Sequence, residues 1–136
     1  MKIFLSKANY EIMVSYAISK APIEACGLIA GERSGEVKII KRIYFLKNID
    51  NSEDHFSIDP VEQLKSVRDM RSVGLIPLGN WHSHPNTPSR PSKEDIRLAY
   101  DGNASYLILS LLKEHPVLNS FRIQGNIVSS EELIIE

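Results

Sequence analysis

The sequence predicts a mixed α/β fold in which helices flank a curved sheet, within one domain covering residues 1–136. Short apolar runs bounded by Gly, Pro and polar residues alternate with stretches whose apolar residues recur at helical spacing. A chain of 136 residues with 43% hydrophobic content can bury one ordinary core. No repeat, low-complexity tract or linker interrupts this pattern, which favours a single layered domain.

The first third of the chain is expected to form a helix and a hairpin. Ser6 is placed to cap a helix over residues 7–19, and Pro22 closes that segment. The apolar run Cys26–Ala30 predicts a short buried strand, followed by a Gly-Glu-Arg-Ser-Gly turn. A second strand should then run from Glu36 to about Leu46, so that the two strands pair as a hairpin.

The rest of the chain continues the alternation of helices and strands. Asp59-Pro60 opens a second helix, and a strand is expected from Leu75 to about Ser83. A loop rich in proline leads to a short helix over about 92–100, and residues 106–112 form a further apolar strand. The tail, 117–135, predicts two more strands around a Gly-Asn turn.

Composition and charge exclude several classes of partner. The formal net charge is −1, so the chain lacks the basic excess that binds nucleic-acid phosphates or anionic membranes, and we expect neither partner. The apolar run near the start is too short for a secretory signal, and no later run could span a bilayer. Cys26 is the single cysteine, which excludes an internal disulfide and is compatible with a cytoplasmic location.

The most informative segment runs from Trp81 to Asp95. His82 and His84 are two residues apart on a predicted strand, so both side chains project from one face. Catalytic zinc commonly takes three protein ligands, among them two histidines with a carboxylate, and keeps a fourth position for water. Asp95 can supply that carboxylate, because the proline-rich loop ends at a helix start that can fold back over the strand end.

Two structural alternatives remain open on these residues alone. A His-x-His pair also occurs as a polar strand surface without any metal. Ser92 and Asp95 also fit the Ser-x-x-Asp capping pattern, in which both side chains bond the backbone at the start of a helix. Capping and metal binding would compete for the same Asp95 carboxylate.

Four segments together resemble the JAMM (MPN+) metalloprotease family. They are Glu24-Ala25-Cys26-Gly27-Leu28, Phe56-Ser57-Ile58-Asp59-Pro60, His82-Ser83-His84-Pro85, and Pro91-Ser92 with Asp95. The resemblance covers most of the chain and is least specific after Leu112. It implies the JAMM/MPN core, which is cytidine-deaminase-like and has a curved, largely antiparallel sheet flanked by helices.

The resemblance also implies a role for each matching residue. His82, His84 and Asp95 correspond to the ligands of one zinc ion per chain, Glu24 to the general base, and Ser92 to a residue that stabilises the tetrahedral intermediate. These roles are chemically consistent. Zinc lowers the pKa of bound water to about 7, a carboxylate can carry the proton to the leaving amine, and a hydroxyl can donate to the oxyanion.

Other reactive residues are expected to be structural. A nucleophilic Cys26 activated by a histidine is conceivable, but its place inside an apolar run favours a buried core thiol. Trp81 alternates with His82 and should enter the core on the opposite face. His55 and His115 flank turns and are expected at the surface.

The resemblance implies hydrolysis of a peptide or isopeptide bond at the C-terminus of a ubiquitin-like or sulfur-carrier protein. An extended Gly-Gly tail would lie along a sheet edge and gain main-chain hydrogen bonds. Two alternatives are a RadC-like, DNA-repair-associated protein, which shares a similar His-x-His-Pro loop, and a non-catalytic MPN interaction module. The neutral charge and the segment at Glu24 argue against the first, and the complete ligand set argues against the second.

Overall fold

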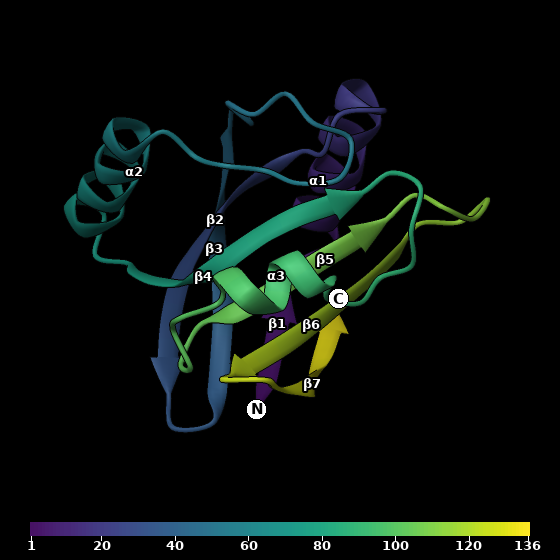
Figure 1. Ribbon diagram of the computed structural model, residues 1–136. Helices are drawn as coiled ribbons and strands as arrows, with labels where there is room; N and C mark the ends of the chain where they lie inside the picture. Colours follow the sequence, from purple (N-terminus) through teal and green to yellow (C-terminus); the bar gives the residue numbers. More distant parts are fainter.

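The structure is a computed structural model that describes residues 1–136 (Figure 1). It has the expected mixed α/β architecture, and the chain order of strands and helices agrees with the sequence analysis apart from one additional strand at the start. The elements are β1 (Lys2–Leu5), α1 (Lys7–Lys20), β2 (Cys26–Ser34), β3 (Val37–Leu46), α2 (Pro60–Ser72), β4 (Ile76–His84), α3 (Lys93–Leu98), β5 (Ser105–Ser110), β6 (Val117–Gln124) and β7 (Ile127–Ile135).

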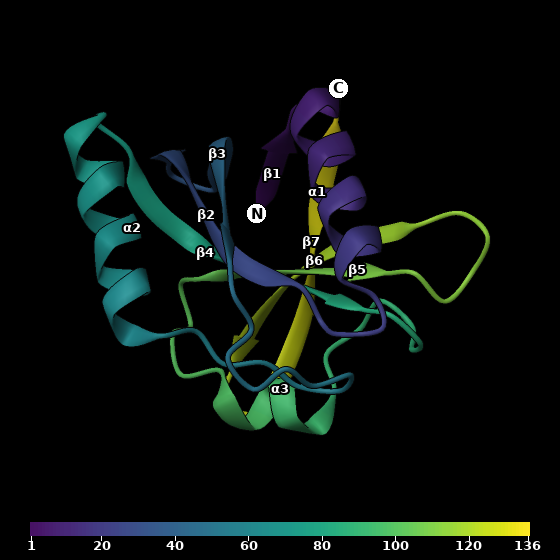
Figure 2. The ribbon, with the colours of Figure 1, turned by 90° about the horizontal axis from the view of Figure 1, so that it is seen from above.

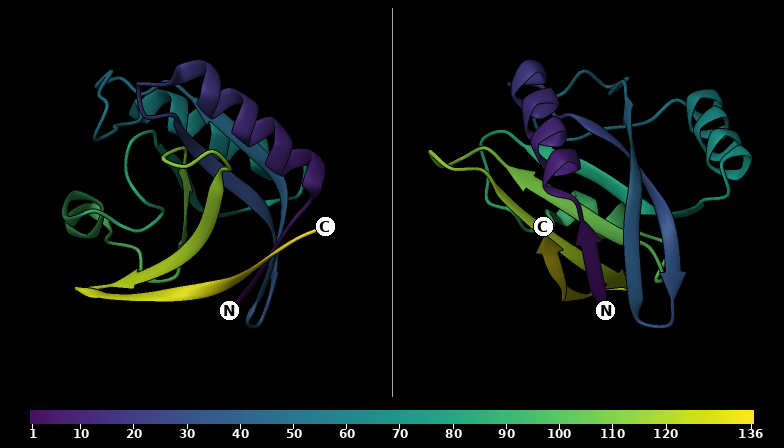
Figure 3. Two further views of the ribbon diagram at one scale, coloured as in Figure 1. Left: turned by 90° about the vertical axis from the view of Figure 1, so that its right-hand side faces the viewer. Right: turned by 180° about the vertical axis from the view of Figure 1, so that it is seen from behind.

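The strands form one curved sheet that closes on itself in the order β1-β3-β2-β4-β5-β6-β7. Neighbours β2–β3, β2–β4, β5–β6 and β6–β7 are antiparallel, whereas β4–β5 and both pairs made by β1 are parallel. The sheet is therefore curved and mostly antiparallel, as expected. Closure depends on β1, which lies between β3 and β7 beside both chain termini (Figure 3).

Element boundaries differ from the sequence analysis where exposed polar residues continue a strand. β2 extends to Ser34 rather than ending at Ala30, because Glu32 and Arg33 still pair with β3 after a bulge at Gly31. The turn is therefore tighter than expected and lies at Gly35, which has a positive φ of 58°. α3 ends at Leu98 instead of Tyr100, whereas α1 begins as expected, with the Ser6 hydroxyl accepting from the amide of Asn9.

The main core lies inside the curve of the sheet and under α1. Trp81 is fully buried there, in edge contact with Tyr16 of α1 and Phe45 of β3, and its indole N–H donates to the carbonyl of Tyr44. The expectation that Trp81 faces the core is therefore confirmed. The three helices cover different sides of the sheet (Figure 2), and none of them has the length and apolar character needed to cross a membrane.

Gly79 lets β4 and β5 approach closely just before the histidine pair. Its φ is +153°, and a Cβ added there would lie 1.9 Å from the carbonyl oxygen of Ser105. We expect Gly79→Ala to destabilise the protein by roughly 2–4 kcal/mol, because it combines backbone strain with overpacking. Chemical denaturation measures this loss.

Gly125→Ala is the matched control for that substitution. Gly125 also has a positive φ, +63°, but an added Cβ would meet nothing within 4 Å. The expected cost there is about 1 kcal/mol from the left-handed conformation alone. Equal destabilisation by the two substitutions would contradict the argument from close approach.

Candidate metal centre

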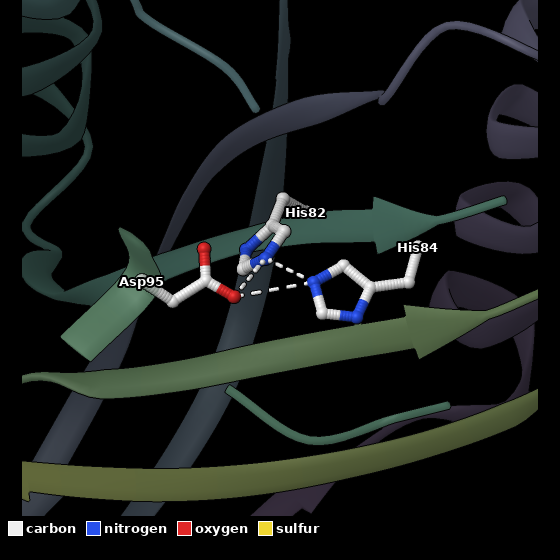
Figure 4. Close-up of side chains that lie close together, drawn as sticks. All are labelled: His82, His84 and Asp95. Atoms are coloured by element: carbon white, nitrogen blue, oxygen red, sulfur yellow. Dashed lines mark hydrogen bonds and ion pairs between the residues drawn. The ribbon is translucent and has the colours of Figure 1, made fainter. Parts of the chain in front are cut away.

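Three predicted ligand residues meet at the carboxyl end of β4 (Figure 4). The Nε2 atoms of His82 and His84 lie 3.0 Å apart, and they lie 3.1 and 3.2 Å from Oδ2 of Asp95. Both imidazoles are buried, and the Asp95 side chain is 13% exposed. Residues separated by a loop in the sequence thus direct one nitrogen or oxygen each to a common point.

The loop between β4 and α3 is tied to the sheet, which explains how α3 reaches the histidines. The Ser89 hydroxyl donates to the carbonyl of Ile108 in β5 at 2.6 Å. The Ser110 hydroxyl, at the end of β5, donates to the carbonyl of Thr87, also at 2.6 Å. These bonds fold the proline-rich loop against β5, so the first turn of α3 faces the end of β4.

The hydrogen bond of His84 orients its ring for metal binding. Nδ1 lies 2.9 Å from the carbonyl oxygen of Pro88, and a carbonyl can only accept, so Nδ1 carries the proton. In the protonated ring Nε2 donates to Asp95, and in the neutral ring Nε2 presents its lone pair toward His82 and Asp95, the arrangement that a metal-binding imidazole needs. Burial alone would lower the pKa of His84, but the Asp95 and Pro88 hydrogen bonds and the charges of Asp95 and Glu24 together raise it.

His82 is held by packing instead of a second hydrogen bond. Phe56 stacks on its ring with centroids 4.7 Å apart and an interplanar angle of 29°. Its Nδ1 is buried without a partner. Burial lowers the pKa of His82 despite the neighbouring Asp95 carboxylate, so the neutral imidazole is favoured, which is the form that binds metals.

Asp95 caps α3 and also contacts both histidines. Its Oδ2 accepts from the Ser92 amide at 2.9 Å, and the Ser92 hydroxyl accepts from the Asp95 amide at 3.0 Å, which completes a capping box. The cap and the contacts to both histidines coexist, because one carboxylate oxygen can accept from several directions; the expected competition between capping and metal binding stays a prediction. Burial would raise the pKa of Asp95, but the histidine hydrogen bonds hold it well below its usual range.

The spacing of the three atoms fits a zinc ion. With metal–nitrogen bonds of about 2.0–2.1 Å, ligand atoms of a tetrahedral zinc site lie about 3.3 Å apart. The separations of 3.0 to 3.2 Å are close to this value, and two imidazoles with one carboxylate form a recurrent zinc set. A pocket borders His82 and Asp95 and has a largely apolar wall that includes Phe56, Leu98 and Ile108.

Glu24 lies two residues before the start of β2, and the charges of His84 and Asp95 shift its pKa. The residue is 3% exposed, and its Oε1 is buried without a hydrogen-bond partner. Burial raises the pKa of Glu24 to about 8, the charges of Asp95 and Asp54 add to the increase, and His84 opposes it. The backbone is fixed next to β4, since the amide of Ala25 donates to the Ser83 hydroxyl at 2.8 Å. A carboxyl group with this pKa can both take up and release a proton near neutral pH.

Cys26 and the two remaining histidines lie where they were expected. Cys26 is fully buried, and burial raises the pKa of its thiol to about 12, which excludes a thiolate nucleophile at neutral pH. His55 and His115 are exposed, and His55 pairs with Asp50 at 3.0 Å. The sequence pointed to Phe56 only as part of a motif, and its stacking on His82 became visible only in the structure.

The buried carboxyl group of Glu24 predicts a pH-dependent stability for the metal-free protein. In the fold Glu24 keeps its proton up to about pH 8, whereas the unfolded chain loses it near the ordinary value of 4.5. The folded state therefore binds more protons between these values, and its stability falls as the pH rises through that window. Glu24→Gln should remove this pH-dependent loss, which is on the order of a few kcal/mol in the free energy of unfolding.

Denaturation of chelated protein at several pH values measures this effect. The expected result is that the Gln variant exceeds the metal-free wild type in stability increasingly from about pH 5 to pH 8, and by a constant amount above it. A constant difference across the whole range would show that the carboxyl group titrates normally.

Comparison with known proteins identifies the family. Residues 6–124 match the family described as prokaryotic homologs of the JAB domain. The chain belongs to this family. It is 33% identical to the CysO-cysteine peptidase of Mycobacterium tuberculosis H37Rv over 120 residues, which are 88% of this chain and 81% of that protein. It is 32% identical to a desampylase of Pyrococcus furiosus over 88 residues, 65% of this chain and 60% of that protein.

Solved structures agree with this assignment. The solution structure of protein DSY2949 from Desulfitobacterium hafniense superposes with a TM-score of 0.91 at 48% identity, covering 100% of this chain and 93% of that one. A JAB1/MPN domain protein from Archaeoglobus fulgidus shares the fold, with a TM-score of 0.61 at 23% identity over 98% of this chain and 99% of that one. The JAMM resemblance and the mixed α/β fold are thereby confirmed. The named relatives are peptidases, which favours an enzyme of this JAB family over the RadC-like and non-catalytic alternatives.

Proposed function

We propose that this JAB-family protein is a zinc metallopeptidase that cleaves a peptide or isopeptide bond at the C-terminus of a ubiquitin-like or sulfur-carrier protein. The observation that carries the proposal is the convergence of His82, His84 and Asp95 beside the buried carboxyl group of Glu24. In this proposal the three converging residues hold one zinc ion per chain.

Zinc bound there would supply a water that ionises near neutral pH and would polarise the scissile carbonyl. The protein residues do the remaining work. Glu24 takes the proton of the attacking water and delivers it to the leaving amine. Its Oε1 has no hydrogen-bond partner, and burial raises the pKa of its carboxyl group to about 8. The rigid capping box keeps Asp95 in place throughout.

Ser92 can cap α3 and stabilise the oxyanion at the same time. Its hydroxyl oxygen accepts from the amide of Asp95, so its own proton stays free for donation. A donor fixed by the helix start needs no reorganisation when charge develops on the carbonyl oxygen, which is the condition for effective electrostatic stabilisation. We assign this donation to Ser92.

The substrate class is proposed from the relatives. One is named a CysO-cysteine peptidase, two are desampylases, and a further one, 31% identical, is a probable TtuB-protein conjugate cleaving protease of Thermus thermophilus. We propose that this chain likewise acts on a carrier with a C-terminal Gly-Gly tail. The sheet edge that the sequence analysis expected for this tail is absent, because β1 pairs with both β3 and β7 and closes the sheet. A cytoplasmic location is proposed from the same relatives, together with the free, buried Cys26.

Incubation of the zinc-loaded protein with carrier adducts tests this function. The adducts are small ubiquitin-like or sulfur-carrier proteins extended at the C-terminal glycine by one amino acid or by an isopeptide-linked lysine peptide. Intact-mass spectrometry should show loss of the added group, which stops on chelation and returns with Zn²⁺. An adduct whose last two glycines are replaced by alanine is the control for tail recognition. Absence of cleavage for every carrier, with zinc content confirmed, would refute the proposal.

A further inference from the structure

The loop between β3 and α2, residues 47–59, is organised around one buried side chain, that of Asn48. The amide Nδ2 donates to the carbonyls of Glu24 at 3.1 Å and His55 at 3.0 Å, with a longer contact of 3.5 Å to Ser52. Its Oδ1 accepts from the backbone amides of Asp50 at 3.1 Å and Ser57 at 3.3 Å. Asn48 is only 7% exposed, so these bonds are largely shielded from water.

One set of these bonds fixes the backbone of Glu24. Its carbonyl accepts from Asn48, and its amide donates to the carbonyl of Ser52 at 2.9 Å. The next amide, of Ala25, donates to Ser83 in β4. The carboxyl group itself has an unpartnered oxygen, so its position depends on these backbone bonds and on packing instead of on a side-chain partner.

The other set fixes the aromatic ring above the metal centre. Asn48 bonds the carbonyl of His55 and the amide of Ser57, the two residues that flank Phe56. The ring of Phe56 stacks on His82 and lines the neighbouring pocket. The loop crosses from the end of β3 to the start of α2 (Figure 1), and the Asn48 amide links the backbone of Glu24 to the backbone on both sides of Phe56.

We infer that Asn48 is a positioning residue for the hydrolysis: it fixes the backbone of Glu24 and the backbone on both sides of Phe56, whose ring stacks on His82. This inference rests on the proposed peptidase function. Only a carboxamide matches the site, since Nδ2 faces carbonyl oxygens and Oδ1 faces backbone amides. An aspartate would place an oxygen against the Glu24 and His55 carbonyls, and alanine would leave those groups without their partner.

Asn48→Ala and the isosteric Asn48→Asp test the inference in the zinc-loaded protein with a carrier adduct. Asn48 forms no hydrogen bond with His82, His84 or Asp95, so zinc content should stay at the wild-type level. We expect kcat to fall by about 10–100-fold, because a displaced general base loses near-attack geometry, while KM changes by less than about threefold. A loss confined to KM, or loss of zinc in proportion to activity, would overturn the inference.

A double-mutant cycle separates positioning from general destabilisation. If Asn48 acts through Glu24, adding Asn48→Ala to Glu24→Gln should lower the remaining single-turnover rate by less than about twofold. Asn48 forms no hydrogen bond with Ser92, so adding Asn48→Ala to Ser92→Ala should lower the rate by the same factor as Asn48→Ala does alone. Equal effects in both backgrounds would contradict positioning through Glu24.

Asp50→Ala is the matched loop control. Asp50 accepts from the Ser57 hydroxyl at 2.6 Å and pairs with His55, but it makes no bond to Glu24. It should reduce kcat less than Asn48→Ala does, and a reduction equal to that of Asn48→Ala would assign the effect to the loop as a whole. Unfolding of both Asn48 variants at the assay temperature would make the role structural and refute the inference. Wild-type cleavage in the same assay tests the peptidase function separately, so the two failures are distinguishable.

Discussion

Replacing Glu24 by Gln is expected to lower kcat by about 10²–10⁴-fold while zinc remains bound, because a positioned general base contributes that much. The substitution keeps the size and the polarity of the side chain and removes only the ability to accept and release a proton. Glu24 lies outside the cluster of His82, His84 and Asp95, so the three converging atoms are unaffected.

The measurement is the single-turnover rate on a carrier adduct, with zinc quantified by elemental analysis of the same sample. Glu32→Gln is the matched control, since Glu32 is an exposed carboxylate on β2, the strand that follows Glu24. It should cleave at the wild-type rate. A Glu24→Gln variant with unchanged kcat would remove Glu24 from the mechanism, and one without zinc would show that Glu24 is needed for metal retention.

The wild-type pH profile should carry the signature of the same group. Because burial raises the pKa of Glu24 to about 8 before any metal is bound, the protonated form predominates at neutral pH in the metal-free protein. A bound cation would favour the carboxylate and move this pKa downward. The acid limb of kcat/KM should accordingly lie below pH 8 and should be absent from the residual activity of Glu24→Gln.

The site was accessible to sequence reasoning because its residues obey short-range rules. His82 and His84 project from one face of a strand by the two-residue period alone, and Ser92 marks the start of the helix that carries Asp95. The role of Asp95 was harder to assign. Capping and metal binding look like competing explanations in a sequence, whereas in three dimensions the same Oδ2 faces the Ser92 amide and both imidazoles.

Other features escaped sequence reasoning because they depend on contacts between distant segments. β1 has only four residues, too few to show a strand period, and it is stabilised by pairing with β3 and β7. The loop after β3 has no periodicity at all. Its order comes from Asn48, whose amide bonds a residue 24 positions earlier, a contact that local propensity cannot predict.

Asp95→Asn should abolish zinc binding at stoichiometric concentration, and with it hydrolysis, while leaving the metal-free fold intact. An asparagine oxygen can still accept from the Ser92 amide, so the capping box on α3 persists. The neutral amide is a much weaker zinc ligand than a carboxylate. Zinc affinity should therefore fall by more than the roughly 10–100-fold that is typical for loss of an outer-shell partner.

Ser92→Ala is the complementary variant, because it removes a capping group and keeps all three converging side chains. It should lose about 1 kcal/mol of stability with the cap, retain zinc, and hydrolyse roughly 10–10³-fold more slowly through loss of the oxyanion donor. Zinc competition with a chromophoric chelator measures zinc affinity, denaturation of the metal-free proteins measures stability, and the carrier-adduct assay measures hydrolysis. If Asp95→Asn bound zinc as tightly as the wild type, Asp95 would be a helix cap alone, and the metal would need a different third ligand.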